Sequence, residues 1–400
     1  MKVEKLKKEF PLLKNKIFYL DNAATTQKPE SVINSFKKFY ESTNGNAHRG
    51  LYSVSQAATK ILDESRETVA DFINAEKDEI VFTKSATEGF NLLAYALESE
   101  VGRWNHVVTT ELEHHSNYVP WQQLTKRTQA ELKIVKYDSK KNELDNFSEY
   151  VTKKTALVSF TLMSNVTGLM PDAKEIIKKI RAENDKIIIV VDATQAIAHI
   201  DIDVKDLDAD FVIFSSHKVY GPTGVGVVYG KKSLLEKLKP FLFGGNMIQE
   251  VKEYESTWAT VPDKFEAGTL DVAGIFAFAE ALRFLNAQDS EEIRNYETEL
   301  KNYALSKFKE VDHLTVLGHT SKNYGPIISI LITDLHPHDL AEICARENVC
   351  VRAGHHCAHP LMRRLEIVAT TRISLSFYNE KKDIDKFIEC INKARKIING

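Results

Sequence analysis

The sequence predicts an α/β fold with a large domain, built on a mostly parallel seven-stranded sheet between helices, and a smaller C-terminal α/β domain. A chain of 400 residues is longer than one simple core supports. From about residue 17, short apolar runs alternate with helix-period stretches, the order that produces a parallel sheet covered by helices on both faces. After about residue 275 a long charged helical stretch, residues 280–309, ends this alternation. We therefore expect a large domain over residues 18–275 and a small domain over 276–400, joined by residues 1–17.

Seven apolar runs indicate the strands of the large sheet. Several of them are apolar at nearly every position, as in strands that are buried on both faces. The runs are Ile80–Thr83, His106–Thr110, Leu132–Tyr137, Ala156–Thr161, Lys186–Asp192, Phe211–Ser216 and Val225–Tyr229. Between them lie helix-period stretches such as Thr87–Leu97, whose apolar residues fall on one stripe. In the small domain we expect a strand over Pro326–Thr333, a helix near Asp339–Asn348 and a helical tail over Lys381–Ile398.

The composition, with 43% hydrophobic and 27% charged residues, is typical of a soluble globular protein. The net charge of −3 gives no electrostatic reason to expect nucleic acid or an anionic membrane as a partner. The lysine-rich start is not followed by the apolar segment of a signal peptide, and no run approaches the roughly 18 apolar residues that a membrane helix needs. Four cysteines without a Cys-x-x-Cys pair fit free thiols in a reducing compartment, so we expect a cytoplasmic protein.

A lysine follows one of the predicted strands directly. In an open parallel sheet, ligands lie beyond the carboxyl ends of the strands. Lys218 lies there, in the segment Ser215–Gly226, beside hydroxyl groups and a histidine. Such a lysine can form a Schiff base where its surroundings lower its pKa, and the following glycines allow tight turns next to a ligand. The segment lacks the Gly-Lys-Ser/Thr ending of a Walker loop. A surface lysine in an ordinary turn is the alternative.

An aspartate ends the preceding predicted strand, 26 positions before Lys218. Pyridoxal phosphate (PLP) acts as an electron sink only while its pyridine nitrogen stays protonated, and a nearby carboxylate such as Asp192 enforces this state. Gln195 has the reach to hydrogen-bond the phenolate oxygen of the same cofactor. Without the lysine segment, an N-cap or turn aspartate would be the preferred interpretation of Asp192.

Two further strand ends carry polar groups. Ser85 and Thr87 open a helix after the first predicted strand, and a helix N-terminus is a natural seat for phosphate, although helix capping explains the same residues. After the second predicted strand comes Glu113-His114-His115, where His114 offers a flat imidazole that could stack on a pyridine ring. A metal site at this histidine pair is the alternative, but no third ligand follows at a fitting spacing.

Together these segments resemble the class V aminotransferase family of fold-type I PLP enzymes, and within it the SufS-type (group II) cysteine desulfurases. The resemblance runs in order over nearly the whole chain, through ten short motifs. They are Leu20–Ala24, His48–Gly50, Ala86–Gly89, Glu113–His115, Ser164–Val166, Asp192–Ala196, Ser215–Lys218, Phe265–Thr269, Arg352–Ala358 and Arg372–Ser374.

The resemblance implies a set of residue roles and a PLP cofactor. Lys218 would hold the cofactor and move protons, and Lys218, Cys357 and His114 would be the catalytic residues. The cofactor would also be bound by Asp192, Gln195, His114, Thr87, Ser215 and His217, with Thr269 reaching the phosphate of the partner in a homodimer. Arg372 would clamp the substrate carboxylate with its bidentate fork, and Asn165, Arg352, His48 and Arg49 would line the substrate pocket.

The same resemblance implies that Cys357 accepts sulfur from free L-cysteine as a persulfide, leaving L-alanine. Its polar, histidine-rich neighbours can favour the thiolate, whereas Cys344, Cys350 and Cys390 have apolar neighbours typical of inert core thiols. A zinc site in His355–His359 is the alternative, but ligands so close in sequence seldom satisfy one tetrahedral centre. The resemblance further implies a SufU- or SufE-type sulfur acceptor, with His338 as a candidate contact, and a role in iron–sulfur cluster assembly.

Other reactions remain open at this stage. Selenocysteine lyase activity would use the same residues, and another PLP reaction or a non-catalytic role would keep the fold. Lys218, Asp192 and Arg372 are all present, which argues against the non-catalytic alternative. The sequence departs from the family pattern at Ser216, at Leu270-Asp271 and at His359; none of these changes removes a functional group.

Overall fold

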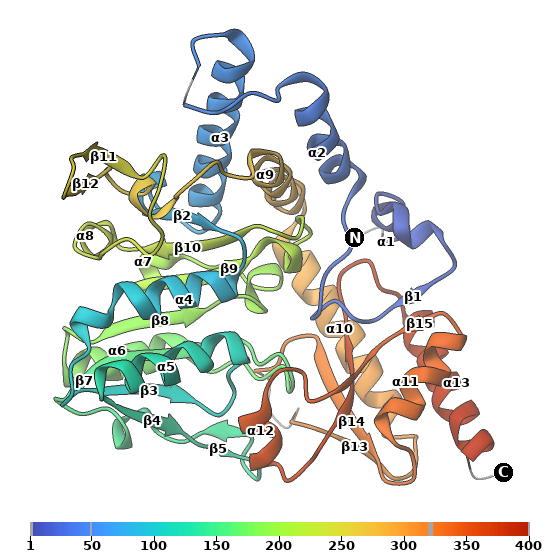
Figure 1. Ribbon diagram of the computed structural model, residues 1–400. Coiled ribbons are helices and arrows are strands. Elements are labelled where there is room, and N and C mark those ends of the chain that lie inside the picture. Colours follow the sequence, from blue (N-terminus) through green and yellow to red (C-terminus); the bar gives the residue numbers. More distant parts are fainter. Residues whose placement is uncertain (1–2, 49, 319–322, 399–400) are drawn as a thin grey trace.

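The computed structural model describes residues 3–48, 50–318 and 323–398 and contains a central seven-stranded sheet (Figure 1). The strand order is β2-β10-β9-β8-β7-β3-β4. All neighbours are parallel except β10, which runs antiparallel to both β2 and β9. The mostly parallel sheet predicted from the sequence is therefore confirmed. The strands are β2 (Ile80–Thr83), β3 (His106–Thr110), β4 (Glu131–Val135), β7 (Thr155–Thr161), β8 (Ile188–Asp192), β9 (Phe211–Ser215) and β10 (Gly226–Gly230).

The sheet is buried on both faces because alternate residues of each strand enter two different cores. In β9, Phe211 and Ile213 belong to one core, while Val212 and Phe214 belong to the other. Full burial of each such side chain contributes about 1.5–3 kcal/mol, which explains the nearly continuous apolar runs. The first core is covered by α4 (Ala86–Ala96), α5 (Val119–Thr128) and α8 (Lys232–Leu235). The second is covered by α2 (Glu30–Ser42), α3 (Ser53–Phe72), α6 (Ala173–Glu183), α7 (Val204–Leu207) and α9 (Val272–Asn286).

The C-terminal part of the chain forms a four-stranded antiparallel sheet in the order β13-β14-β17-β16. The stretch 280–309, which the sequence suggested as one helical stretch, is divided: α9 ends at Asn286 and α10 begins at Ser290. Asp289 caps α10 by accepting a hydrogen bond from the Glu292 N–H at 2.9 Å. The elements are α10 (Ser290–Phe308), β13 (Leu314–Val316), β14 (Ile327–Ile332), α11 (Pro337–Arg346), β16 (Arg352–Gly354), α12 (His359–Arg364), β17 (Thr370–Ser374) and α13 (Lys381–Ile398).

The N-terminal segment lies against this C-terminal part (Figure 1). After α1 (Val3–Lys7), the short strand β1 (Phe18–Tyr19) pairs in parallel with β15 (Val349–Cys350). Phe10 is fully buried, and its ring packs against that of Tyr378 in a tilted arrangement, with the centroids 4.7 Å apart. Contacts between residues more than 300 positions apart thus join the two ends of the chain. Small two-stranded sheets are formed by β5 (Tyr137–Asp138) with β6 (Glu143–Leu144) and by β11 (Ile248–Val251) with β12 (Ser256–Trp258).

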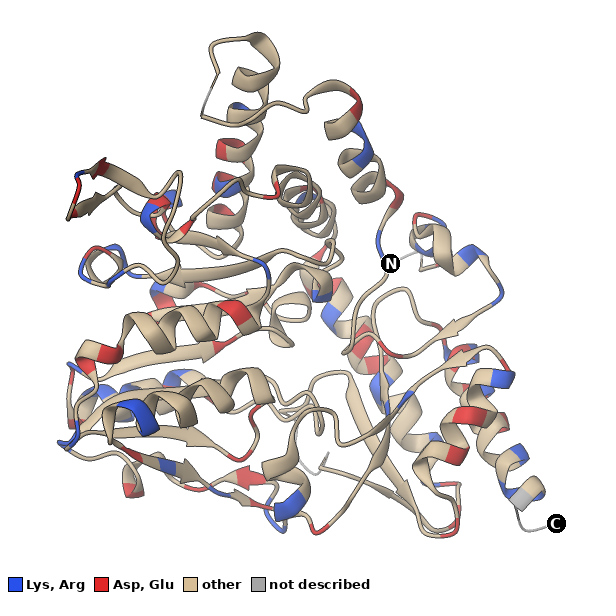
Figure 2. Ribbon diagram, viewed as in Figure 1, with Lys and Arg blue, Asp and Glu red and all other residues tan. Residues whose placement is uncertain are grey.

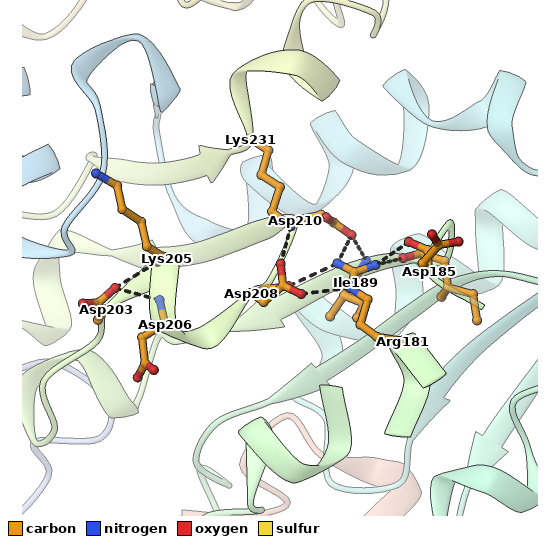
Figure 3. Close-up of polar contacts among 10 residues, drawn as sticks. Arg181, Asp185, Ile189, Asp203, Lys205, Asp206, Asp208, Asp210 and Lys231 are labelled. Carbon is orange, nitrogen blue, oxygen red and sulfur yellow. Dashed lines mark hydrogen bonds and ion pairs between the residues drawn. The ribbon is translucent and has the colours of Figure 1, made fainter. Parts of the chain in front are cut away.

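A polar network ties together the amino ends of β8 and β9, at the edge of the sheet opposite the carboxyl ends (Figure 3). Arg181 of α6 donates to the carbonyl of Ile187 at 2.6 Å and to the Asp210 carboxylate at 2.8 Å. Asp210 also accepts from the Ile189 N–H at 2.8 Å and pairs with Lys231 at 3.0 Å. The network fixes strand ends that have no part in the cavity described below.

Charged residues of both signs are interspersed over the elements in the view of Figure 2. This agrees with the small net charge of −3. In the described parts of the chain, no helix has the length and apolar character that crossing a bilayer requires.

Candidate active site

A cavity of about 210 Å³ lies at the carboxyl ends of the central strands. Thr161, Asp192 and Ser215, the last residues of β7, β8 and β9, all line it. The parallel arrangement brings these strand ends to one edge of the sheet, as expected for an open α/β fold. Ten residues predicted from the sequence meet here: Thr87, His114, Asn165, Asp192, Gln195, Ser215, His217, Lys218, Arg352 and Arg372.

Lys218 ends the short 3₁₀ turn Ser216–Lys218 that follows β9, so the strand delivers its side chain into the cavity. Burial, followed by the nearby Arg372 guanidinium, lowers the pKa of Lys218 to about 8. Asp192 opposes this shift because a carboxylate stabilises the ammonium form. A pKa of about 8 leaves roughly a tenth of the amine neutral at pH 7, far more than for an ordinary lysine, and the neutral amine is the form that acts as a nucleophile.

Asp192 is buried at the end of β8, and its carboxylate accepts a hydrogen bond from the Thr194 N–H at 2.9 Å. Burial raises the pKa of Asp192, and the bonds from Thr194 and the charge of Lys218 act in the opposite direction. Gln195 donates from Nε2 to the Ala23 carbonyl at 2.9 Å. An amide nitrogen carries two hydrogens, so the second remains for a group in the cavity.

His114 lies in the cavity as a neutral imidazole. Its Nδ1 accepts a hydrogen bond from the Ser116 N–H at 3.1 Å, which requires Nδ1 to be unprotonated and leaves the hydrogen on Nε2. Burial and the charge of Lys218 lower the pKa of His114 to about 3. The preceding residue, Glu113, is buried and accepts bonds from the Thr110 hydroxyl at 2.7 Å and the Thr161 N–H at 3.1 Å. Glu113 thereby holds the His114 loop against β7.

Small hydroxyl residues gather at the N-terminus of α4. Ser85 caps this helix by accepting from the Glu88 N–H, and the Ser215 hydroxyl accepts from the Ala86 N–H at 2.8 Å. The Thr87 and Ser116 hydroxyls lie 2.7 Å apart. Gly226 is required beside this turn, because a Cβ at that position would lie 2.4 Å from the Ser85 carbonyl carbon. Capping and an anion seat are both consistent with this geometry.

Arg372, on β17, brings a buried guanidinium to the opposite side of the cavity. It donates to the Asn165 carbonyl at 2.8 Å and to the Asp21 carboxylate at 3.0 Å. Burial lowers the pKa of Arg372, whereas Asp21 raises it. Arg352 stands opposite Arg372 in the register of β16 and β17 and also lines the cavity. Two guanidinium groups at one wall favour a carboxylate ligand.

Cys357 does not line this cavity but directly follows a residue that does, His356. Both residues have left-handed backbone angles, with φ of 52° for His356 and 55° for Cys357. Each non-glycine residue in that region costs about 1–2 kcal/mol, so the loop needs external support. Asn165 donates to the His356 carbonyl at 2.7 Å, and the His115 N–H donates to the Cys357 carbonyl at 2.8 Å. The half-buried Cys357 thiol is thus held on a constrained loop next to the cavity.

Three imidazoles stack beside this loop. The rings of His355 and His359 have centroids 3.9 Å apart, and those of His115 and His359 are 4.9 Å apart and nearly parallel, with 5° between their planes. His355 Nδ1 accepts from the Cys357 N–H at 3.1 Å. His359, one of the departures from the family pattern, donates its N–H to His115 Nε2 at 3.1 Å. Within the described residues, no group of three potential ligands is arranged around a metal position.

Three predicted residues lie apart from the main cavity. His48 and Thr269 line a second cavity of about 210 Å³ with residues of the Asn46–His48 and Gly268–Leu270 segments. His338 is exposed near the N-terminus of α11, where its ring stacks on His336 at 5.4 Å. Arg49 lies outside the described residues.

The profile of the aminotransferase class-V family matches residues 18–387. The chain belongs to this family. A probable cysteine desulfurase of Streptomyces coelicolor is 41% identical over 406 aligned residues, covering 98% of this chain and 97% of the relative. A probable cysteine desulfurase of Staphylococcus aureus is 39% identical and covers 99% and 98% of the two chains.

Solved structures agree with this assignment to the aminotransferase class-V family. The Escherichia coli cysteine desulfurase CsdA superposes with a TM-score of 0.92 at 31% identity, covering 100% of this chain and 99% of that one. A cysteine desulfurase of Thermococcus onnurineus superposes with a TM-score of 0.94 at 34% identity, covering 99% and 98%. The fold-type I architecture and the resemblance to group II cysteine desulfurases are therefore confirmed.

PLP is the cofactor of the aminotransferase class-V family, and the main cavity fits it. Asn165 Oδ1, His356 Nδ1 and Arg372 Nε are among the buried polar atoms of cavity residues that have no hydrogen-bond partner within the described chain. Together with the Lys218 amine, whose pKa is lowered, and the buried Asp192 carboxylate, these atoms are suited to a bound molecule that has both positively and negatively charged groups.

Two contributors to the cavity were not assigned from the sequence. Asp21 was noted only as part of a motif, yet its carboxylate is the partner of Arg372. His356 was noted only as a neighbour of Cys357, yet it lines the cavity and is bonded through Nε2 to the Thr370 hydroxyl at 2.7 Å. The contact of Asp21 has no local sequence signal, because Arg372 lies about 350 positions away, whereas the bond of His356 to Thr370 spans 14 positions.

Proposed function

We propose that the protein is a PLP-dependent cysteine desulfurase that converts L-cysteine to L-alanine and carries the released sulfur on Cys357 as a persulfide. The observation that carries this proposal is the position of Cys357. Its loop is fixed by Asn165 and His115 directly beside the cavity that contains Lys218 and Arg372. Full-length similarity to cysteine desulfurases supports the same activity.

The residues that would hold PLP follow from the chemistry of the cavity wall. Lys218 would attach the cofactor, and Asp192 would pair with its pyridine nitrogen. His114 would stack on its ring, and the second amide hydrogen of Gln195 would meet its phenolate oxygen. Thr87, Ser215 and His217 would bind the phosphate at the start of α4, and Thr269 would serve the partner subunit of a homodimer.

The chain's own groups have defined tasks in the reaction. PLP supplies the electron sink that allows the Cα–H and Cβ–S bonds of cysteine to be broken. Arg372, assisted by Arg352, would bind the substrate carboxylate and orient these bonds. Lys218 Nζ would take the proton from Cα and return a proton to the product, because its lowered pKa makes both steps accessible near neutral pH.

The Cys357 thiolate would attack the substrate sulfur. The S–S bond forms as the Cβ–S bond breaks, so the products are alanine and the persulfide of Cys357, with no external oxidant or reductant. The His114 Nε2–H lies in the cavity as a hydrogen-bond donor for the departing groups. The exposed side of the Cys357 loop would then meet a SufU- or SufE-type acceptor, with His338 as a candidate contact. Iron–sulfur cluster assembly in the cytoplasm would be the destination of the sulfur.

The proposal is tested by mass spectrometry after L-cysteine is added to the PLP-loaded protein. We expect alanine in solution and 32 Da (one sulfur atom) added to the peptide that contains Cys357, consistent with the thiol-to-persulfide change. Cys357→Ala should keep the cofactor absorbance and lose both products, while Cys350→Ala serves as the matched control. Unchanged alanine release from Cys357→Ala would contradict the role of Cys357. A rate on selenocysteine far above that on cysteine would instead favour a selenocysteine lyase.

A further inference from the structure

The carbonyl oxygen of His217 accepts an unusual number of hydrogen bonds. This oxygen belongs to the peptide bond that joins His217 to Lys218. It accepts from the Thr26 N–H at 3.0 Å, the Thr26 hydroxyl at 3.2 Å and the Thr25 hydroxyl at 3.0 Å. The fourth donor is Lys28 Nζ at 3.0 Å. A carbonyl has two lone pairs, so four converging donors saturate it and fix the plane of the peptide.

Lys28 has no part in the proposed reaction, and its ammonium group is turned inward. Besides the His217 carbonyl, Nζ donates to the Thr26 carbonyl at 2.5 Å and to the Thr25 hydroxyl at 3.2 Å. An ammonium has three donors, and here all three are directed at protein oxygens. Burial lowers the pKa of Lys28 to about 7. A lysine whose only role was to make the protein surface soluble would extend its ammonium group into solvent.

The same segment also holds the chain after Lys218. The Tyr220 N–H donates to the Thr26 hydroxyl oxygen at 2.8 Å, and Tyr220 itself has a left-handed φ of 63°. The segment is anchored at its other end, because the Gln27 N–H donates to the Tyr378 hydroxyl at 3.0 Å. Residues 21–28 therefore form a strap. It holds His217 and Tyr220, on either side of Lys218, and is itself hydrogen-bonded to the C-terminal part of the chain.

We propose that Lys28 is a positioning residue that, with Thr25 and Thr26, clamps the His217–Lys218 peptide and so fixes where the Lys218 amine lies. Lys28 is not among the residues that line the cavity. It acts on the backbone from which the Lys218 side chain departs. The inference rests on the proposed function, because the position of the Lys218 amine matters to the reaction only if Lys218 holds PLP.

The test compares Lys28→Met, which keeps the stem and removes the ammonium, with Lys16→Met, which removes an exposed lysine from the same N-terminal region. Hydrogen–deuterium exchange of peptides that cover residues 216–222 is measured with and without PLP. At pH 6, where Lys28 is mostly charged, loss of its hydrogen bond to the His217 carbonyl should speed exchange there by about tenfold or more. In the PLP-loaded enzyme, kcat should fall while KM for cysteine stays within about twofold, because the substrate contacts are intact.

Lys28→Met with the exchange rates and kcat of Lys16→Met would overturn the proposal. Thr25→Val removes a second donor to the same carbonyl with little change in shape, and it decides the question if Lys28→Met does not fold. Faster exchange over residues 216–222 in Thr25→Val supports the clamp, and unchanged exchange refutes it. Failure of the proposed function would look different: the unmodified protein would release no alanine, while the exchange of the PLP-free chain would still test the clamp.

Discussion

Replacing Arg372 by lysine keeps a positive charge in the cavity but removes the planar fork. In the structure, the two terminal nitrogens of Arg372 donate to the Asn165 carbonyl at 2.8 Å and to Asp21 at 3.0 Å, and Nε remains unpaired. One ammonium cannot satisfy both of these partners and also bind two oxygens of a substrate carboxylate. A lost hydrogen bond to a charged group costs about 1.5–3 kcal/mol, or roughly 10- to 150-fold in kcat/KM.

The assay is alanine formation over a range of L-cysteine concentrations. We expect Arg372→Lys to lower kcat/KM by that factor, mainly through a higher KM, while the cofactor absorbance persists. Arg346→Lys, on the exposed face of α11 where Arg346 pairs with Glu342, is the matched control. A KM for Arg372→Lys within twofold of the unmodified enzyme would refute the assignment of Arg372 as the carboxylate clamp.

Three further predictions concern the cofactor, the pH dependence and the opposite edge of the sheet. Asp192→Asn keeps the shape of the side chain and the acceptor for the Thr194 N–H but removes the charge. The Kd for PLP should therefore rise, and kcat should fall by at least about tenfold (about 1.4 kcal/mol). An unchanged Kd for PLP would contradict the pairing of Asp192 with the pyridine nitrogen. The folded-state pKa of Lys218 is lowered to about 8, so in the PLP-free chain the buried ammonium destabilises the fold below that pH. Lys218→Met should therefore raise the free energy of unfolding of the PLP-free chain at pH 7 by on the order of 3 kcal/mol, which a higher Tm would report. The difference should shrink as pH rises above 8 and vanish above the unfolded pKa; a pH-independent difference would exclude this cause. Arg181→Met should lower the free energy of unfolding in urea by about 1.5–3 kcal/mol, because Asp210 loses one charged donor but keeps Lys231, with unchanged kcat; a loss of kcat would show that this edge communicates with the site.

The large sheet could be predicted because its signal is local. Strands buried on both faces are apolar at most positions, and β2 and β3 have the bounds expected from the sequence. The cavity followed from the same pattern, since the polar residues after Phe82, Val191 and Phe214 must meet where parallel strands end. The sequence pattern alone therefore predicts that Lys218 and Asp192 lie at the same edge of the sheet, as the structure shows.

Contacts between distant segments could not be predicted in this way. The pairing of β1 with β15 rests on two residues of each strand, too few for a recognisable period. The Asp21–Arg372 ion pair and the bond of Lys28 to the His217 carbonyl join segments about 190 to 350 positions apart. Hydrogen bonds of this kind depend on the exact path of the backbone, which hydrophobic periodicity does not encode.

The joining of the two chain ends has a consequence for synthesis on the ribosome. The last strand of the central sheet, β10, is complete at Gly230, so the large sheet can close while the rest of the chain is still being made. The strap formed by residues 21–28, however, meets Ser374 and Tyr378 only after more than 370 residues have been made. A chain that stops before residue 352 thus contains Lys218 but lacks Arg352, Cys357 and Arg372. Under the proposed function, such a shortened chain would have the lysine that holds PLP but not the groups that bind the substrate carboxylate and accept the sulfur.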